Sequence, residues 1–237
     1  MNTKKPLIIA HRGAHKLAPE NTIAAARLAL QNGASALEVD VRLCASGEIV
    51  LFHDNFLWHH FHRLKPVIFT SIQELKKLRF ANTEQMTNDF VCTLDEFLEA
   101  FKGTVPLNLD VKTFMTDYFT LADTLVKTVK RHQVLDQVWF SAFNPLFLII
   151  LKRKYPEVRV GYLFRNMPWL HRELDLLIKA EAWHPHYHLV NEKFLKKARK
   201  LGKEVYVWTI SDEVMYRKML GYPFNGIITD ILLNSDV

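Results

Sequence analysis

The residues best suited to chemistry begin with two histidines that each close an apolar run. His11 is followed directly by Arg12 and Gly13, and His53 is followed by Asp54. An imidazole that titrates near neutral pH and a guanidinium with forked donors, both at one strand end, suit protonation chemistry on a phosphate ester better than core packing. Gly13 by itself predicts only a tight turn.

Acidic residues form the second group. Glu38 and Asp40 are two apart in a predicted strand, so both side chains project from the same face. Two adjacent carboxylates repel one another unless a cation lies between them, and oxygen ligands favour a hard ion such as Mg²⁺, Ca²⁺ or Mn²⁺. A third acid, Asp110, shares a strand face with Asn108 and Lys112. An isolated aspartate of this kind is more often an exposed or paired strand-end residue than a ligand.

These residues lie in an alternation of strands and helices. Short β-branched or apolar runs occur at Leu7–His11, Ala36–Arg42, Ile49–His53, Val105–Val111, Gln137–Ala142, Val158–Phe164, Glu181–His184, Val205–Thr209 and Gly226–Thr229. Amphipathic stretches between them are Asn21–Asn32, Thr93–Phe101, Asp117–His132, Pro145–Tyr155, Asn191–Leu201 and Asp212–Leu220, with Asn21 as the expected N-cap of the first. The alternation predicts an α/β fold, a (β/α)8 TIM barrel of parallel strands with helices outside.

One strand exceeds the eight of such a barrel, and a β-hairpin explains it. Val41–Phe52 holds two alternating apolar segments around Ser46-Gly47, with no room for a helix. A turn centred between Ser46 and Gly47 pairs Asp40 with His53. Both groups would then lie at the barrel rim, where sites of this fold are built.

The segment from about 54 to 92 reads as an insertion over the barrel mouth within one domain that covers residues 1–237. It carries Trp58-His59-His60-Phe61-His62 and a short helix that Ser71 opens. Ser71 with Glu74, and Thr93 with Glu96, have the spacing of capping boxes.

Two histidine groups could suggest a soft metal: His59, His60 and His62, and His184, His186 and His188. Neither group has nearby carboxylates in the sequence or a zinc spacing, so packing, pocket-lining or contact with the substrate's alcohol group is the favoured interpretation.

Composition narrows the remaining possibilities. The chain has 237 residues, 49% of them hydrophobic and 24% charged, which suits one large core. The net charge of +6 comes largely from lysines and arginines on predicted outer helices, with no aromatic residues interleaved among them. A solvated helix face is therefore favoured over nucleic-acid binding, although the positive field would help to attract phosphate-bearing substrates.

The apolar run Pro6–Ala10 is too short for a signal peptide or a stable membrane insertion, and Cys44 and Cys92 are expected to be reduced. A cytoplasmic location is expected.

The order of motifs along the chain resembles the glycerophosphodiester phosphodiesterase family from end to end. These motifs are His11-Arg12-Gly13, Pro19-Glu20-Asn21-Thr22, Glu38-Val39-Asp40-Val41, His53-Asp54, Asp110-Val111-Lys112, Ser141-Ala142-Phe143-Asn144-Pro145, Val207-Trp208-Thr209 and Gly226-Ile227-Ile228-Thr229-Asp230. The first four, in this order and spacing, are the most specific.

The resemblance implies roles for individual residues. His11 and His53 would be the general acid and base, and Arg12 would neutralise the non-bridging phosphate oxygens. Lys112 would also bind phosphate. Trp208 is similar in position to an aromatic that lines the alcohol pocket, although burial inside the barrel would explain it equally well.

The resemblance also implies a divalent cofactor, Mg²⁺ or Ca²⁺, held by Glu38, Asp40 and Asp110. The family usually has Glu where Asp110 stands, and the shorter side chain would hold the ion through water, displaced or more weakly. The usual Asp-Arg-Thr-Thr stretch after His53-Asp54 is missing, and Ile231-Leu232 replaces the common Tyr-Pro.

The implied reaction is metal-dependent hydrolysis of small glycerophosphodiesters to glycerol 3-phosphate and an alcohol. Its nucleophile would be water or the substrate's own neighbouring hydroxyl. One alternative is a lysophospholipase D-type enzyme with Trp58 and Phe61 as an apolar wall. The other is a non-catalytic barrel that binds a phosphate ligand. The sequence does not name the head group or the oligomeric state.

Overall fold

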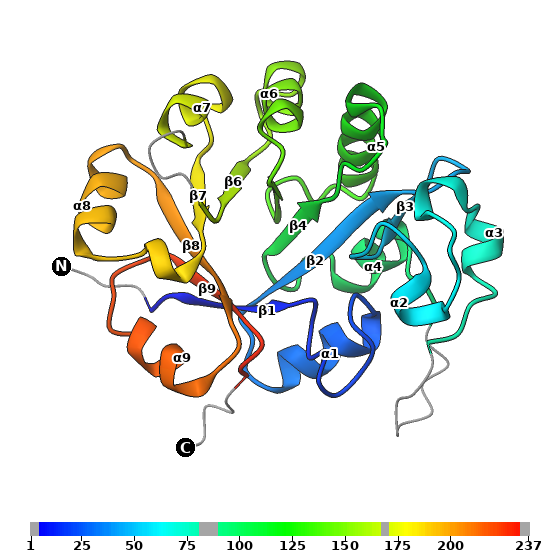
Figure 1. The fold of residues 1–237 in the computed structure, drawn as a ribbon, viewed down its shortest axis with the longest axis horizontal. Helices are drawn as coiled ribbons and strands as arrows, with labels where there is room; N and C mark the ends of the chain where they lie inside the picture. Colours follow the sequence, from blue (N-terminus) through cyan, green and yellow to red (C-terminus); the bar gives the residue numbers. More distant parts are fainter. Residues whose placement is uncertain (1–4, 81–89, 167–170, 233–237) are drawn as a thin grey trace.

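The computed structural model describes residues 5–80, 90–166 and 171–232. Within them, eight parallel strands close into a barrel in the order β1-β2-β4-β5-β6-β7-β8-β9, with β9 paired back to β1. The strands are β1 (Leu7–His11), β2 (Ala36–Leu43), β4 (Leu107–Val111), β5 (Val138–Ala142), β6 (Val160–Phe164), β7 (Ala182–Pro185), β8 (Glu204–Ile210) and β9 (Gly226–Thr229). Figure 1 shows the ring of strands with the helices around it, the (β/α)8 barrel that the alternation predicted.

The outer helices cover the strands with apolar faces. They are α1 (Ile23–Gln31), α4 (Leu94–Phe101), α5 (Tyr118–Arg131), α6 (Pro145–Lys154), α7 (His171–Ile178), α8 (Glu192–Lys200) and α9 (Glu213–Met219). In α4 the buried residues Leu94, Phe97, Leu98 and Phe101 recur at helical spacing. Every residue of β2 and of β4 is buried, as expected for strands packed on both faces. Helix α7 is an element that the sequence pattern did not predict.

The predicted hairpin exists, but its register differs by one residue. Strand β3 (Ile49–Leu51) lies antiparallel to β2 outside the barrel, with Val41 opposite Leu51. The Phe52 amide donates to the Asp40 carbonyl at 3.0 Å, so the predicted pairing of Asp40 with His53 was wrong. The reason is a three-residue turn: the Cys44 amide bonds the Glu48 carbonyl, and Gly47 adopts φ +95°.

The segment between β3 and α4 packs around its own small core. It contains α2 (Trp58–Phe61), α3 (Ile72–Leu75) and a 3₁₀ turn, η1 (Val67–Phe69). Buried side chains join this segment to the outer face of the hairpin, namely Cys44, Val50, Phe52, Leu57, Val67, Leu75, Leu78 and Val91. Both capping boxes, at Ser71 and at Thr93, are formed. In Figure 1 this segment lies beside β3 and α4.

Two further findings concern the cysteines and the helices. Cys44 and Cys92 are both buried, and neither takes part in a disulfide. None of the helices in the described part of the chain is long and apolar enough to cross a membrane.

Candidate active site

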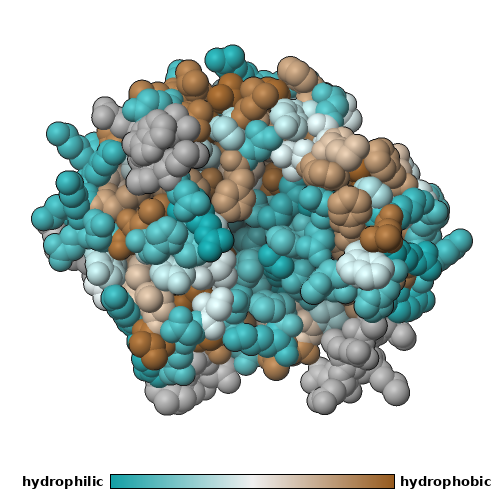
Figure 2. Space-filling model, viewed as in Figure 1, coloured by the Kyte–Doolittle hydropathy of each residue, from teal (hydrophilic) through white to brown (hydrophobic). Residues whose placement is uncertain are grey.

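All eight residues singled out from the sequence line one cavity of about 130 Å³ at the carboxyl ends of the barrel strands: His11, Arg12, Glu38, Asp40, His53, Asp110, Lys112 and Trp208. Asn108, Ser141, Phe143, Leu163, Thr209 and Ile228 complete the lining. Figure 2 shows a hollow with hydrophilic walls near the centre of the face, with hydrophobic surface beside it. Barrel enzymes build their sites at this end of the strands.

His11 is oriented by a carboxylate from the opposite end of the chain. Its Nδ1 lies 2.7 Å from Asp230 Oδ1, and Ser211 Oγ donates to Asp230 Oδ2 at 2.6 Å. Burial acts to raise the pKa of Asp230, but the contacts with His11, His15 and Ser211 outweigh it and bring this pKa well below its usual range. An ionised carboxylate only accepts, so Nδ1 donates its proton to Asp230 and Nε2 is left for other contacts.

The second histidine has a matching arrangement. His53 Nδ1 lies 2.8 Å from Asp54 Oδ1, and both side chains are about one-third exposed, at 37% and 33%. The Arg42 guanidinium donates to the His53 carbonyl at 2.6 Å and fixes the backbone where it leaves β3. His53 therefore reaches the cavity from just beyond the hairpin strand, outside the β2–β3 ladder.

Arg12 is held by two carboxylates. Its Nη1 donates to Glu20 Oε2 at 2.9 Å, and its Nε lies 3.0 Å from Asp40 Oδ2. Burial acts to lower the pKa of Arg12, but the charges of Asp40, Glu20 and Glu38 raise it above its usual value. Burial likewise acts to raise the pKa of Glu20, but the bond from His60 and the charge of Arg12 lower it to about 2.

Asn21 has a different role from the one expected. Thr22, and not Asn21, caps α1, through a bond from the Ala25 amide to its hydroxyl. Asn21 adopts φ +59°, and its amide group donates to Asp40 Oδ2 at 2.9 Å while accepting from the Asp40 amide. The N-cap prediction for Asn21 was wrong because this buried side chain pairs with the neighbouring strand.

The three acidic residues form a compact buried cluster. Oxygens of Glu38, Asp40 and Asp110 all lie within 4.8 Å of one another. Burial, together with repulsion from neighbouring carboxylates, raises the pKa of Glu38 and of Asp110. Burial also acts to raise the pKa of Asp40, but the cations Lys112 and Arg12 lower it below its usual range. Asp110 Oδ1 is buried with no hydrogen-bond partner. The cluster thus has the charge, the oxygen donors and the free acceptor that suit a hard divalent ion.

Lys112 lies between two members of this cluster. Its Nζ is 2.8 Å from Asp40 Oδ1 and 2.6 Å from Asp110 Oδ2. Desolvation acts to lower the pKa of Lys112, but the two carboxylates raise it above the usual value, so the ammonium is charged. Lys112 therefore neutralises part of the acidic cluster at the cavity wall.

Trp208 forms an aromatic wall. Its Nε1 donates to the His184 carbonyl at 2.6 Å, and its ring meets Phe143 and His186 edge-on, with centroids 5.2 Å and 5.0 Å apart. The ring is partly buried and also lines the cavity, so both predicted environments apply.

The alternating histidines His184, His186 and His188 begin in β7 and continue beyond it, and they do not form one group. His184 is buried in the barrel, where Trp139 Nε1 donates to its Nε2 at 3.3 Å, and burial lowers its pKa to about 3. His186 and His188 contact each other beyond the strand, with 2.5 Å between their Nδ1 atoms. In the described part of the chain no carboxylate joins these three as a ligand set.

Two participants were missed in the sequence: the role of Asp230, and His15. His15 Nε2 lies 2.9 Å from the same Asp230 oxygen that binds His11. Asp230 follows the last barrel strand directly, and this position was the only available signal. Nothing in the local pattern around His15 indicated its contact.

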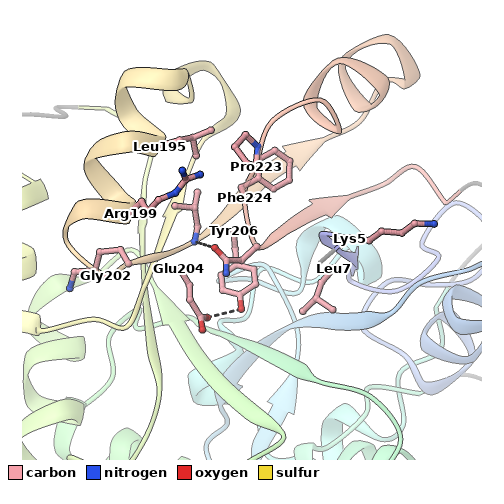
Figure 3. Close-up of a pocket in the computed structure, with 12 residues that line it drawn as sticks. Lys5, Leu7, Leu195, Arg199, Gly202, Glu204, Tyr206, Pro223 and Phe224 are labelled. Atoms are coloured by element: carbon pink, nitrogen blue, oxygen red, sulfur yellow. Dashed lines mark hydrogen bonds between the residues drawn. The ribbon is translucent and has the colours of Figure 1, made fainter. Parts of the chain in front are cut away.

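A larger cavity of about 560 Å³ lies at the other end of the barrel, against α8 and the starts of β8 and β9. Figure 3 shows Tyr206 beside Glu204, to which its hydroxyl donates. Asn225, also in the lining, accepts from the Val205 amide. Neither of the two groups of potential metal ligands in the described residues lies in this lining.

The chain is similar to known proteins in sequence and in fold. The model of the glycerophosphoryl diester phosphodiesterase family matches residues 11–233. A glycerophosphodiester phosphodiesterase of Caldanaerobacter subterraneus is 30% identical over 234 residues, covering 95% of this chain and 94% of that protein.

Among solved structures, a phosphodiesterase of Oleispira antarctica in complex with the product sn-glycerol-3-phosphate has 28% identity and a TM-score of 0.87, covering 96% of this chain and 94% of that one. A glycerophosphodiester phosphodiesterase of Thermotoga maritima has 26% identity and a TM-score of 0.78, covering 96% and 95%.

Proposed function

The chain belongs to the glycerophosphoryl diester phosphodiesterase family and is a phosphodiesterase, and from this premise we propose that it hydrolyses glycerophosphodiesters to glycerol 3-phosphate and an alcohol, with His11 and His53 as the acid–base pair. One observation carries this proposal. Two imidazoles, each with a carboxylate on Nδ1, line the same small cavity as Arg12 and three buried acids. The non-catalytic alternative is set aside because the matched family and the relative of Caldanaerobacter subterraneus are both named for phosphodiesterase activity.

The proposed mechanism uses the Nε2 atoms of the two histidines. This atom carries a lone pair in the base and a proton in the acid. One histidine takes the proton of the attacking oxygen as the new P–O bond forms. The other gives its proton to the alkoxide as the P–O bond to the alcohol breaks. Asp230 and Asp54 keep each ring in the tautomer that leaves Nε2 available. The Arg12 guanidinium stabilises charge on the phosphoryl oxygens with the donors that Glu20 and Asp40 leave free.

The metal requirement is part of the proposal. Glu38, Asp40 and Asp110 would hold a divalent ion such as Mg²⁺ or Ca²⁺, which supplies stabilisation of negative charge on the phosphoryl group. The raised pKa of Glu38 supports this role. It means that the buried acidic cluster is stabilised by an added positive charge, which either a proton or a metal ion can supply. Lys112 completes the neutralisation at Asp40 and Asp110 and presents a cation to the phosphate.

A second candidate substrate is a lysophospholipid, cleaved at the same bond. A hollow of about 450 Å³, lined by Arg42, Phe114 and Phe143 among others, shares Lys112 and Phe143 with the cavity. Phe143 is 48% exposed and would contact an acyl chain. Phe61, expected in the apolar wall, instead packs against Phe52 inside the inserted segment.

The decisive experiment is a substrate panel. Water-soluble glycerophosphodiesters and lysophospholipids are incubated with the purified protein, with Mg²⁺ or with chelator, and glycerol 3-phosphate, the alcohol and any cyclic phosphate are measured. We expect metal-dependent release of glycerol 3-phosphate from the soluble diesters. Equal turnover in chelator would refute the metal requirement, and turnover of lysolipids alone would replace the proposed substrate.

We further propose that the chain is one barrel domain with its insertion at about 54–92, working on a small molecule in the cytoplasm. Cys44 and Cys92 are not joined in a disulfide, which is compatible with a reducing compartment. Limited proteolysis that yields two stable fragments would contradict a single domain, and cell fractionation tests the location.

A further inference from the structure

A second cluster of metal-ligating groups lies at the wall of the cavity. One potential ligand atom each from His11, His15 and Asp230 lies within 4.8 Å of the other two. The two imidazole nitrogens are 2.7 Å and 2.9 Å from the one carboxylate oxygen. This cluster is separate from the acidic cluster, whose members are Glu38, Asp40 and Asp110.

The turn after β1 creates this arrangement. Gly13 adopts φ +78°, and the Ala14 amide bonds the Ala25 carbonyl at 2.8 Å, so the chain folds back over the start of α1. His15 thereby returns to the ring of His11, with centroids 6.0 Å apart and planes at 89°. The perpendicular rings direct one nitrogen each toward Asp230.

The donor set differs in chemistry from the acidic cluster. Two imidazole nitrogens and one carboxylate oxygen are a common set for Zn²⁺ with one open position, whereas oxygen-only ligands favour Mg²⁺ or Ca²⁺. His15 Nε2 is buried and lacks hydrogen-bond geometry despite its 2.9 Å contact. Ser211 Oγ, 2.6 Å from the other oxygen of Asp230, provides the outer contact that commonly orients a ligating carboxylate.

We propose that His11, His15 and Asp230 form a binding site for Zn²⁺, or for an ion of similar preference such as Co²⁺, and that occupancy of this site inhibits the phosphodiesterase. The inhibitory part rests on the proposed acid–base role of His11. The binding part rests only on the three side chains.

Inhibition follows from proton chemistry at His11. A metal on Nδ1 replaces the proton there and leaves Nε2 as an N–H, so the ring has no lone pair with which to take a proton. It also cannot become an imidazolium and give a proton to the leaving alkoxide. The ion would thus block both possible roles of His11 while the acidic cluster still holds its hard ion.

The binding test uses Co²⁺ as a spectroscopic probe on the full chain, with saturating Mg²⁺ on the acidic cluster. We expect wild type to show the intense visible absorption of four-coordinate Co²⁺, displaced by one equivalent of Zn²⁺, and His15→Gln to lose it. His188→Gln removes one partner of the other close imidazole pair and should keep the spectrum. Glu38→Gln, in the acidic cluster, should keep it as well. No such absorption in wild type, or its retention in His15→Gln, would overturn the site.

The activity test measures Zn²⁺ inhibition, with each protein normalised to its own zinc-free rate. We expect His15→Gln to raise the Zn²⁺ concentration for half inhibition by at least about tenfold, and His188→Gln to leave it unchanged. A wild type that binds one Zn²⁺ at this site yet keeps full activity would overturn the inhibition. A protein inactive on every diester would instead refute the proposed function, and the Co²⁺ spectra would still decide the site.

Discussion

Asp230 Oδ1 lies 2.7 Å from His11 Nδ1, so a residue just after the last barrel strand orients a histidine at the end of the first one. Closure of the barrel between β1 and β9 brings the two together. The contact places the proton of His11 on Nδ1 and leaves Nε2 as the atom that the proposed mechanism uses.

Removing this carboxylate should therefore act through His11. We expect Asp230→Asn to lower kcat by about 10²-fold with a smaller change in KM, because the ring loses its ionised acceptor and its preferred tautomer. Asp54→Asn tests the equivalent contact of His53 and should behave similarly. Asp212→Asn, at the N-cap of α9, is the matched surface control and should retain kcat. Unchanged kcat in Asp230→Asn would show that the contact is only structural.

The two histidines themselves should be indispensable. We expect His11→Ala and His53→Ala each to lower kcat by about 10² or more, since a positioned acid or base is lost. His59→Ala, an exposed histidine on α2, serves as the control and should keep the wild-type rate. Circular dichroism would verify folding of all three, and full activity in either cavity variant would remove that residue from the mechanism.

Asp110 should be the weakest of the three acidic residues toward the ion. Its Oδ2 already pairs with Lys112 at 2.6 Å, which leaves Oδ1 for an ion. Titrating activity with Mg²⁺ and Ca²⁺, we expect Asp110→Glu to keep or tighten activation, Asp110→Ala to weaken it, and Glu38→Ala to weaken it most. An Asp110→Ala variant that titrates like wild type would mean that Asp110 is not a ligand.

Stabilisation by Mg²⁺ should increase with pH. The folded-state pKa of Glu38 is raised above 4.5, chiefly by burial. Without an ion, the folded protein is therefore destabilised as Glu38 ionises, between its unfolded pKa and this higher folded pKa. A bound cation favours the ionised form and offsets this loss. We expect the Mg²⁺-induced rise in Tm to be larger at pH 8 than at pH 5, and this difference to be smaller in Glu38→Gln, where Asp110, whose pKa is also raised, still contributes. A rise that is equal at both pH values in wild type would contradict this account.

The turn that carries Arg12 depends on a glycine. A Cβ on Gly13 would lie 2.6 Å from the Ala25 carbonyl carbon, in addition to its φ of +78°. Gly47 has φ +95° but open space around its Cβ position, so it isolates the backbone effect. In urea unfolding we expect Gly47→Ala to cost about 1–2 kcal/mol and Gly13→Ala about 1–3 kcal/mol more. Equal losses would show that the turn relaxes around the added methyl.

The sequence alone was sufficient for the barrel and for the membership of the cavity. Leu7–His11 and Gly226–Thr229 were predicted with the observed bounds, because short apolar runs between amphipathic helices leave little choice of element. Glu38 and Asp40 share a face by strand periodicity, and a parallel barrel brings all strand ends to one rim. Residues at the carboxyl ends of the strands therefore come together at this rim, and the details of side-chain packing do not change that.

Only the tertiary structure decided which contacts orient the cavity residues and shift their pKa values. The hairpin register depended on whether two or three residues form the turn at Gly47, which local pattern does not distinguish. Asn21 was taken for a cap because its partner, Asp40, lies on another element. His11 and Asp230 are 219 positions apart and meet only when the barrel closes. The raised pKa of Glu38 likewise arises from burial and neighbouring charges, which depend on distances in space rather than along the chain.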